Sequence, residues 1–379
     1  MAMNSRRTVG GFGRLFPVIS VALACALGSR PTGPPGSAPE VLSHFRPVAA
    51  EVRQFILDTM RVLGVPGAAI CVRKDGRLVW SEGFGYADLE QHVPVTTQTR
   101  FRIGSVSKPL TAAALGLLSE AGKLDWDAPV QRYVPTFPVK RYPITVRQVA
   151  GHLAGIRHYR PGEFENQKHY KTVLEGLTIF QDDSLLFQPG TQFAYSSYGW
   201  NLLSAVIEGA SGESFLSFMD HRVFVPAGMS HTGADFPDSI VPARTRFYTR
   251  PDSVGPVVNA PFVDNSYKWA GGGFLSTAED LAQFGEQMLD GRLLHLATVA
   301  LLWTSQHTAD GKATDYGIGW DVEQDAAGRR RISHSGGSVG GTANLLIYPA
   351  EHLIVAVLVN SDRTFIEAVP RYAEPFLAP

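Results

Sequence analysis

The sequence predicts an α+β fold in which both ends of the chain build one antiparallel β-sheet and the middle forms a helical subdomain. Strand-like patterns occur early in the chain, within residues 67–84, and again near its end, within residues 316–360. Between residues 125 and 266 the pattern is one of helices and long loops. This order favours a shared sheet with an inserted α-subdomain. A cleft between two such parts is a usual place for an active site.

The composition limits the kind of protein and its partners. The chain has 379 residues, 44% of them hydrophobic, which is enough for a large core or two interleaved subdomains. The net charge is −1 and no basic stripe indicates nucleic-acid binding. Of the two cysteines, Cys25 lies in an N-terminal apolar run and Cys71 alternates with apolar neighbours. An intramolecular disulfide framework is therefore excluded, and Cys71 is predicted to be a buried structural thiol.

Residues 1–28 are predicted to be a signal peptide. Arginines precede an apolar run at residues 18–27, and small residues follow it. This run is too short to span a bilayer comfortably, so no integral membrane span is expected after processing. The Pro- and Gly-rich residues 29–40 are predicted to be a flexible linker.

Three other interpretations of the N-terminus stay open. Arg6 and Arg7 suggest a twin-arginine signal, and the small residues before Cys25 suggest a lipoprotein cleavage site with a lipid anchor. The absence of acidic residues before Glu40 also fits a mitochondrial transit peptide. We favour export to the periplasm or beyond, with a mitochondrial location as the alternative.

The first third of the body begins with an amphipathic helix at residues 45–63. Two strands follow, at residues 67–73 and 77–84, and Asp75-Gly76 between apolar runs predicts a hairpin. A polar, strand-like run at residues 99–103 leads into a helix at residues 109–120.

The rest of the chain is predicted to be helical in the middle and to form strands in its final third. Helices are predicted in the middle at residues 144–153, 200–208 and 212–221. A Gly-rich segment at residues 269–274 precedes Ser276 and Glu279, which have capping-box spacing. Four strands and one final helix complete the chain, at residues 316–323, 329–334, 343–348, 353–360 and 365–375.

Ser105 and Lys108 are the first candidates for chemistry. Ser105 lies at the start of the helix that ends near Gly122, where free N–H groups and the positive end of the dipole favour negative charge. Lys108 lies one turn along on the same face. A serine needs a base, and a lysine can serve only when neutral, which burial can achieve. Alone, the pair also fits an N-cap serine beside a surface lysine.

Two further stretches strengthen this pattern: Tyr195-Ser196-Ser197, in a predicted loop before the helix at residue 200, and His334-Ser335-Gly336-Gly337, at the end of a predicted strand. With Ser-x-x-Lys they occur in the order Ser-x-x-Lys, Tyr-x-Asn-like and Lys-Thr-Gly-like. The chain therefore resembles the serine β-lactamase and penicillin-binding-protein superfamily, in its class C-like branch. Segments 151–159 and 263–277 look most like the mitochondrial serine β-lactamase-like proteins and their bacterial relatives.

The resemblance implies a β-lactamase/transpeptidase-like fold with helices on both faces of the sheet, within a serine hydrolase domain at residues 41–379. Its α/β part would comprise residues 41–103 and 270–379, and its helical part residues 104–269. The activity that it implies is that of a peptidase or esterase acting through an acyl-enzyme. No cofactor or metal is implied, the partner is a small-molecule or peptide substrate, and the oligomeric state is not predicted.

The resemblance also implies residue roles. Ser105 would be the acylated nucleophile, Lys108 would assist its deprotonation, and Tyr195 would relay protons. The N–H groups of Ser105 and Gly337 would form the oxyanion hole, and Gly residues there permit a close backbone approach. A lysine cation can also pull a nearby tyrosine toward phenolate. The implied substrate-binding residues are Ser197, His334, Ser335 and Gly336.

Two departures from the family pattern bear on the substrate. Ser197 stands where asparagine is usual, so the reach of an amide is lost. His334 stands where many members have lysine, and an imidazole is mostly neutral at pH 7. Both changes favour a peptide, ester or amide substrate over a dedicated penicillinase. They also suggest that turnover of a carboxylate-bearing substrate falls as His334 loses its proton between pH 5 and 8.

Alternative functions remain at this point. A true class C-like β-lactamase or D,D-peptidase shares the same motifs, and a non-catalytic penicillin-binding-like module shares the fold. Gly336 to Gly340 also satisfies Gly-x-Ser-x-Gly, with Ser338 as nucleophile, but that elbow needs a strand, a turn and a helix. A strand is predicted after Ser338 instead. His152 and His158 are expected to have structural or cleft-lining roles, because they lack metal-ligand spacing.

Overall fold

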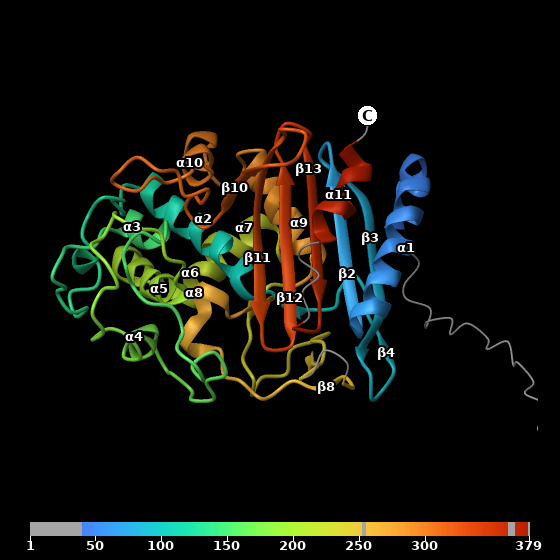
Figure 1. Cartoon of the computed structure of the whole chain (residues 1–379), viewed down its shortest axis with the longest axis horizontal. Helices are drawn as coiled ribbons and strands as arrows, with labels where there is room; N and C mark the ends of the chain where they lie inside the picture. The colour runs from blue at the N-terminus through green and yellow to red at the C-terminus, as the bar shows by residue number, and fades with distance from the viewer. Residues whose placement is uncertain (1–39, 252–254, 363–367, 378–379) are drawn as a thin grey trace, which may run out of the picture. The chain divides into compact units, whose positions relative to one another are not determined.

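Eight strands form the principal sheet among the described residues of the computed structural model, which are 40–251, 255–362 and 368–377. The strand order is β1-β3-β2-β13-β12-β11-β10, all antiparallel, and β4 pairs with β3 (Figure 1). The strands are β1 (Glu40–Val41), β2 (Gly67–Lys74), β3 (Arg77–Asp88), β4 (Val93–Pro94), β10 (Asp321–Gln324), β11 (Arg330–Ser338), β12 (Gly341–Tyr348) and β13 (Leu353–Val359).

The two ends of the chain meet in the middle of this sheet, as the sequence predicts. There β2 and β13 are antiparallel neighbours, with Cys71 opposite Ala356 and Val72 opposite Val355. The hairpin between β2 and β3 turns at Asp75 and Gly76, with φ of 51° and 74°. Positive φ at both turn residues is the signature of the tight hairpin turn that Asp-Gly favours. Cys71 is fully buried, as expected, and burial raises the pKa of its thiol.

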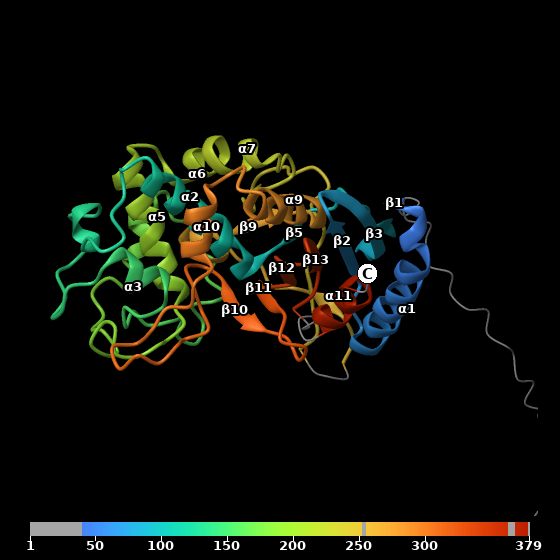
Figure 2. The same ribbon diagram turned by 90° about the horizontal axis from the view of Figure 1, so that it is seen from above.

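Helices cover both faces of the sheet, because the strands present apolar side chains to both sides. Helix α1 (Arg46–Leu63) and helix α11 (Val369–Leu377) lie on one face, and helix α9 (Ala278–Leu289) lies on the other (Figure 2). Alternate residues of β2 separate into two cores: Ile70 and Val72 pack with α1 and α11, whereas Cys71 packs with α9 and the helical part. Alternation along a strand produces this division.

The helical part is built around α2 (Ser107–Glu120), most of whose residues are buried. Its other helices and turns are α3 (Val146–Ala150), α4 (Val173–Leu177), α5 (Ser197–Ser211), α6 (Phe215–Phe218), α7 (Val225–Ala227), α8 (Trp269–Gly272), α10 (Leu296–Leu302), η2 (Gly104–Val106), η3 (Val130–Arg132), η4 (Met219–Phe224) and η5 (Ser266–Lys268). The single turn η1 (Ser43–Phe45) lies outside this part and directly precedes α1. Short ladders join β5 (Phe101–Arg102), β9 (Phe274–Ser276) and β6 (Gly233–Ala234), and join β7 (Tyr248–Thr249) to β8 (Val258–Asn259).

Several element boundaries differ from the expectation. Helix α5 begins at Ser197 rather than at residue 200, because the Ser196 hydroxyl caps it by accepting from the Gly199 N–H at 3.0 Å. Gly212 ends this helix in a left-handed conformation instead of starting the next one. Thr277, not Ser276, caps α9, so the predicted capping box is wrong. The Ser276 hydroxyl instead lies 2.7 Å from that of Thr232.

The last strands also differ in extent. Strand β10 begins at Asp321, five residues later than expected, and β11 continues through Ser338. The His-Ser-Gly-Gly stretch is therefore inside a strand and not at its end. The predicted signal peptide and all of the predicted linker except Glu40 lie outside the described residues. Among the described residues, no helix is long and apolar enough to cross a membrane.

Candidate active site

Ser105 lies in the single turn η2, immediately before α2. The preceding Gly104 has a φ of 49°, and a Cβ atom there would lie 2.5 Å from the carbonyl oxygen of Gly337. Glycine is therefore required, since both the backbone conformation and the close approach exclude a side chain. This contact presses η2 against β11 and places Ser105 at the junction of the sheet and the helical part.

Lys108 is fully buried beneath Ser105. Its Nζ lies 3.0 Å from Ser105 Oγ, 3.0 Å from Ser197 Oγ and 2.7 Å from the carbonyl oxygen of Gly271. Burial, and then the positive charge of Lys268, lower its pKa well below the ordinary 10.5. The fold thus lowers the pKa of Lys108, as is required for a lysine that acts as a base near neutral pH.

The start of α5 is held by two histidines. His152 Nδ1 accepts the N–H of Ser196 at 3.0 Å, and His158 Nδ1 accepts the N–H of Ser197 at 3.1 Å. Burial lowers the pKa of both imidazoles, that of His158 to about 4, so both are neutral acceptors at pH 7. These contacts fix the backbone directly after Tyr195 and agree with the expected structural and cleft-lining roles.

Tyr195 faces the same place. Its ring lies over Lys108, with Nζ 4.8 Å from the centroid, and its hydroxyl interacts with those of Ser105 and Ser197. Desolvation nevertheless raises the pKa of Tyr195, and the two hydroxyl contacts offset only part of the rise. The expectation of a phenolate is therefore wrong: with a neutral lysine beside it, the tyrosine keeps its proton.

The two glycines of β11 have different surroundings. A Cβ atom on Gly336 would lie 2.0 Å from the Ile103 carbonyl oxygen and 2.8 Å from the Ser105 nitrogen, whereas one on Gly337 would meet nothing within 4 Å. Gly337 lines the cavity at Ser105. Strand β10 pairs with β11 only as far as Ser333, so the edge of β11 is open at these glycines.

His334 does not belong to the cavity lining. It is 3% exposed, its Nδ1–H donates to the Ser335 carbonyl at 2.6 Å, and the Tyr316 hydroxyl donates to its Nε2 at 3.0 Å. Burial is the main cause that lowers its pKa to about 3. The predicted loss of a His334 proton between pH 5 and 8 is therefore wrong, because the imidazole is already neutral there. Ser335 also lies outside the lining.

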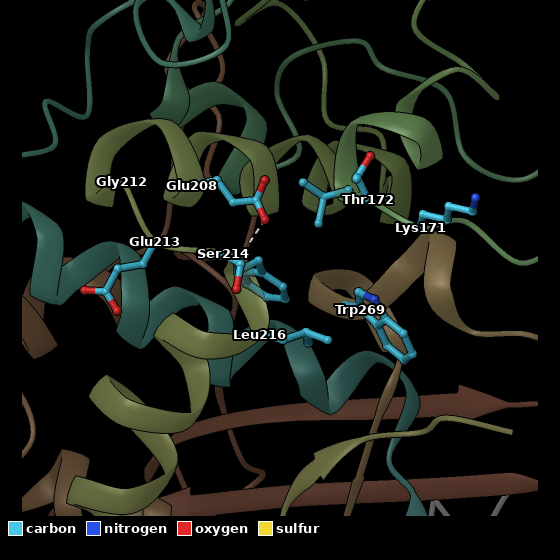
Figure 3. A pocket seen from close by; sticks show the side chains of 10 residues that line it. Lys171, Thr172, Glu208, Gly212, Glu213, Ser214, Leu216 and Trp269 are labelled. Atoms are coloured by element: carbon cyan, nitrogen blue, oxygen red, sulfur yellow. Dashed lines mark hydrogen bonds between the residues drawn. The ribbon is translucent and has the colours of Figure 1, made fainter. Parts of the chain in front are cut away.

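The cavity at Ser105 has a volume of about 100 Å³. It gathers Ser105, Tyr195, Ser197 and Gly337 with His158, for which a structural or cleft-lining role was expected, and with Tyr159. Its other lining residues were not predicted from the sequence: Phe164, Lys268, Gly271 and Gly272. The missed lysine had one signal, a cation between two aromatic residues in an otherwise buried segment. A larger cavity of about 560 Å³ lies elsewhere, with Trp269 and Glu208 in its wall (Figure 3). None of the predicted site residues lines it.

Ser338 has no nucleophile geometry. It closes the hairpin between β11 and β12 opposite Gly341, so a strand and not a helix follows it. Its buried hydroxyl has no hydrogen-bond partner among the described residues. Within the described part of the chain, no base lies at hydrogen-bond distance from this hydroxyl, in contrast to Ser105.

This fold and this grouping of motifs define a β-lactamase/transpeptidase-like protein of the penicillin-recognising class. The chain belongs to the Beta-lactamase family, whose family model matches residues 52–374. The motifs at Ser105, Tyr195 and His334 all lie within the matched range.

Individual relatives agree with this assignment. The human serine beta-lactamase-like protein LACTB, mitochondrial, is 33% identical over 85% of this chain and 76% of its own length. Penicillin-binding protein 4* of Bacillus subtilis is 26% identical over 81% of this chain and 71% of its own. Among solved structures, the octameric penicillin-binding protein homologue from Pyrococcus abyssi superposes with a TM-score of 0.76 at 28% identity, covering 87% of this chain and 77% of that chain.

Proposed function

We propose that this protein is a serine hydrolase that forms an acyl-enzyme on Ser105 with a peptide, amide or ester substrate. The observation that carries the proposal is the 3.0 Å contact between Ser105 Oγ and the Nζ of a fully buried Lys108 with a lowered pKa. A weak nucleophile is activated when a base of this kind is within hydrogen-bond reach.

The three contacts of Lys108 Nζ can all be made by a neutral amine. A neutral amine has two N–H donors and one lone pair, and Nζ has three oxygen neighbours. The Gly271 carbonyl can only accept, and the Ser197 hydroxyl can accept the second N–H. The lone pair is then directed to the hydroxyl of Ser105, which is the arrangement that a general base needs.

The remaining steps follow from the same groups. As Ser105 Oγ attacks the carbonyl carbon, its proton passes to Lys108, and Tyr195 gives its own proton to the leaving group and regains one from Lys108. The N–H groups of Ser105 and Gly337 would stabilise the oxyanion, each for about 3–4 kcal/mol. Water then attacks the ester, with the same residues acting in reverse.

The substrate class is proposed on two observations. Ser197 holds Lys108 by a 3.0 Å contact and is not an amide, and His334 is buried outside the lining. Both favour a peptidase or esterase over a dedicated β-lactamase. A class C-like β-lactamase or D,D-peptidase, and a non-catalytic module, remain the alternatives. The relatives named as mitochondrial support the mitochondrial alternative to export.

The test is turnover by wild type, Ser105→Ala and Ser338→Ala. The panel comprises p-nitrophenyl acetate and butyrate, nitrocefin, and aminoacyl and peptidyl p-nitroanilides. We expect Ser105→Ala alone to abolish turnover, and the best substrate then separates esterase, peptidase and β-lactamase. Loss in Ser338→Ala instead would refute the site assignment, and a wild type without any turnover or labelling would favour the non-catalytic module.

A further inference from the structure

Lys268 is a second buried lysine in the cavity at Ser105. It is the last residue of η5 and directly precedes α8, the helix whose Gly271 carbonyl accepts a hydrogen bond from Lys108. Lys268 is 2% exposed, and it lines the same cavity of about 100 Å³ as Ser105. Any acyl group that reaches Ser105 through this cavity therefore passes close to this lysine.

The protein satisfies little of the hydrogen-bonding capacity of Lys268 Nζ. Its one hydrogen bond among the described residues is to the Phe164 carbonyl, at 3.4 Å, and the rings of Phe164 and Tyr267 lie 4.5 and 5.2 Å away. An ammonium has three donors. A buried cation with so few partners is costly unless another group completes its surroundings.

The charges that face Lys268 do not supply a free counter-ion. Arg102 is a like charge, Lys108 is neutral, and among the described residues Asp235 is the carboxylate that acts on Lys268 appreciably. Asp235 is already engaged: its Oδ2 accepts from Arg102 at 2.7 Å and from Asn265 at 2.8 Å. The position nearest to Lys268 that remains open to an anion is thus the cavity itself.

The strand position where many family members have a lysine is occupied here by His334, which is neutral, is held by the Tyr316 hydroxyl and the Ser335 carbonyl, and does not line the cavity. We propose that the Lys268 ammonium binds a carboxylate of the substrate, so that the enzyme prefers acyl compounds with a carboxylate near the reacting carbonyl. This inference rests on the proposed function. It makes Lys268 a specificity-determining residue beside the Ser105 machinery.

The preference has a pH dependence with a definite sign. Burial, and then Arg102, lower the pKa of Lys268 from 10.5 to about 7. The ammonium that attracts a carboxylate is present below this pKa and is lost above it. Preference for an anionic substrate is therefore expected to be strong at pH 6 and weak at pH 8.5.

The test compares matched acids and primary amides. One pair, glutaryl p-nitroanilide and its terminal amide, places the charge on the acyl side. The other pair, 3-acetoxybenzoate and 3-acetoxybenzamide, places it on the leaving group. At pH 6 we expect wild type to prefer the acid at least tenfold in kcat/KM in one pair, mainly through KM. The preference should fall toward one in Lys268→Met and, for wild type, at pH 8.5.

The control variant is Lys171→Met, which removes the same charge from an exposed lysine at the larger cavity (Figure 3). It should keep the preference. A preference that is missing in wild type, that survives in Lys268→Met or that does not change with pH would overturn the inference. Labelling of wild-type Ser105 by an uncharged fluorophosphonate distinguishes a failure of this inference from a failure of the proposed function. Labelling without a preference for the acid refutes only the role of Lys268. Absence of labelling refutes both the role of Lys268 and the proposed function.

Discussion

Replacing Lys268 by methionine is expected to stabilise the protein in a pH-dependent way. The folded state lowers the pKa of this lysine from 10.5 to about 7. At about 1.4 kcal/mol per pH unit, burying the protonated Lys268 lowers the free energy of unfolding by about 4–5 kcal/mol at pH 6. Methionine has a stem of similar length and no charge, so it removes this cost without leaving a large cavity.

The sign of the pH effect follows from proton binding. Between pH 7 and 10.5 the unfolded chain keeps a proton on Lys268 that the folded protein has released, so wild-type stability rises with pH in this window. The advantage of Lys268→Met should thus shrink by about 2 kcal/mol between pH 7 and pH 9. Urea unfolding of both proteins at the two pH values measures this change, with Lys171→Met as the charge-matched surface control. An advantage that is constant or grows with pH would refute the reasoning.

Three further predictions concern the site. Gly336→Ala should lower kcat/KM at least about a hundredfold, because the new Cβ would clash with the Ile103 carbonyl and shift the Ser105 N–H of the oxyanion hole. Gly337→Ala should keep most of the activity, because its Cβ would meet no atom within 4 Å. Equal losses in the two variants would contradict this. Ser197→Ala should cost about tenfold in kcat, about the value of one hydrogen bond to Lys108, and an unchanged kcat would contradict it. Replacing His334 by Gln should leave the shape of the pH profile of kcat/KM unchanged between pH 5 and 8, because the imidazole is already neutral; an inflection present in wild type alone would count against this.

Local signals in the sequence predicted the sheet well. Asp75-Gly76 specifies a hairpin because few residue pairs accept positive φ at two successive positions. The apolar strands of both chain ends could pair only in a shared sheet once the middle was helical. Boundaries were less predictable where side chains compete for the same role. Ser276 and Thr277 are both good caps, and a tertiary contact with Thr232 decides between them.

The residues at the centre of the site could be predicted from the sequence, but the protonation states of their neighbours could not. Ser105 and Lys108 could be selected because their spacing is local. The protonation states of Tyr195 and His334 depend on burial and on distant partners such as Tyr316, which no local pattern reports. Lys268 was missed because its aromatic neighbours in the sequence indicate burial, whereas only the tertiary fold brings it beside Ser105.

Covalent labelling tests the central claim most directly. Wild type and Ser105→Ala would each be treated with an uncharged fluorophosphonate, and the adduct would be located by mass spectrometry of tryptic peptides. The acyl-enzyme mechanism predicts one adduct per chain in wild type, on Ser105, and none in Ser105→Ala. An adduct on Ser338, or no adduct in wild type, would contradict the acyl-enzyme mechanism.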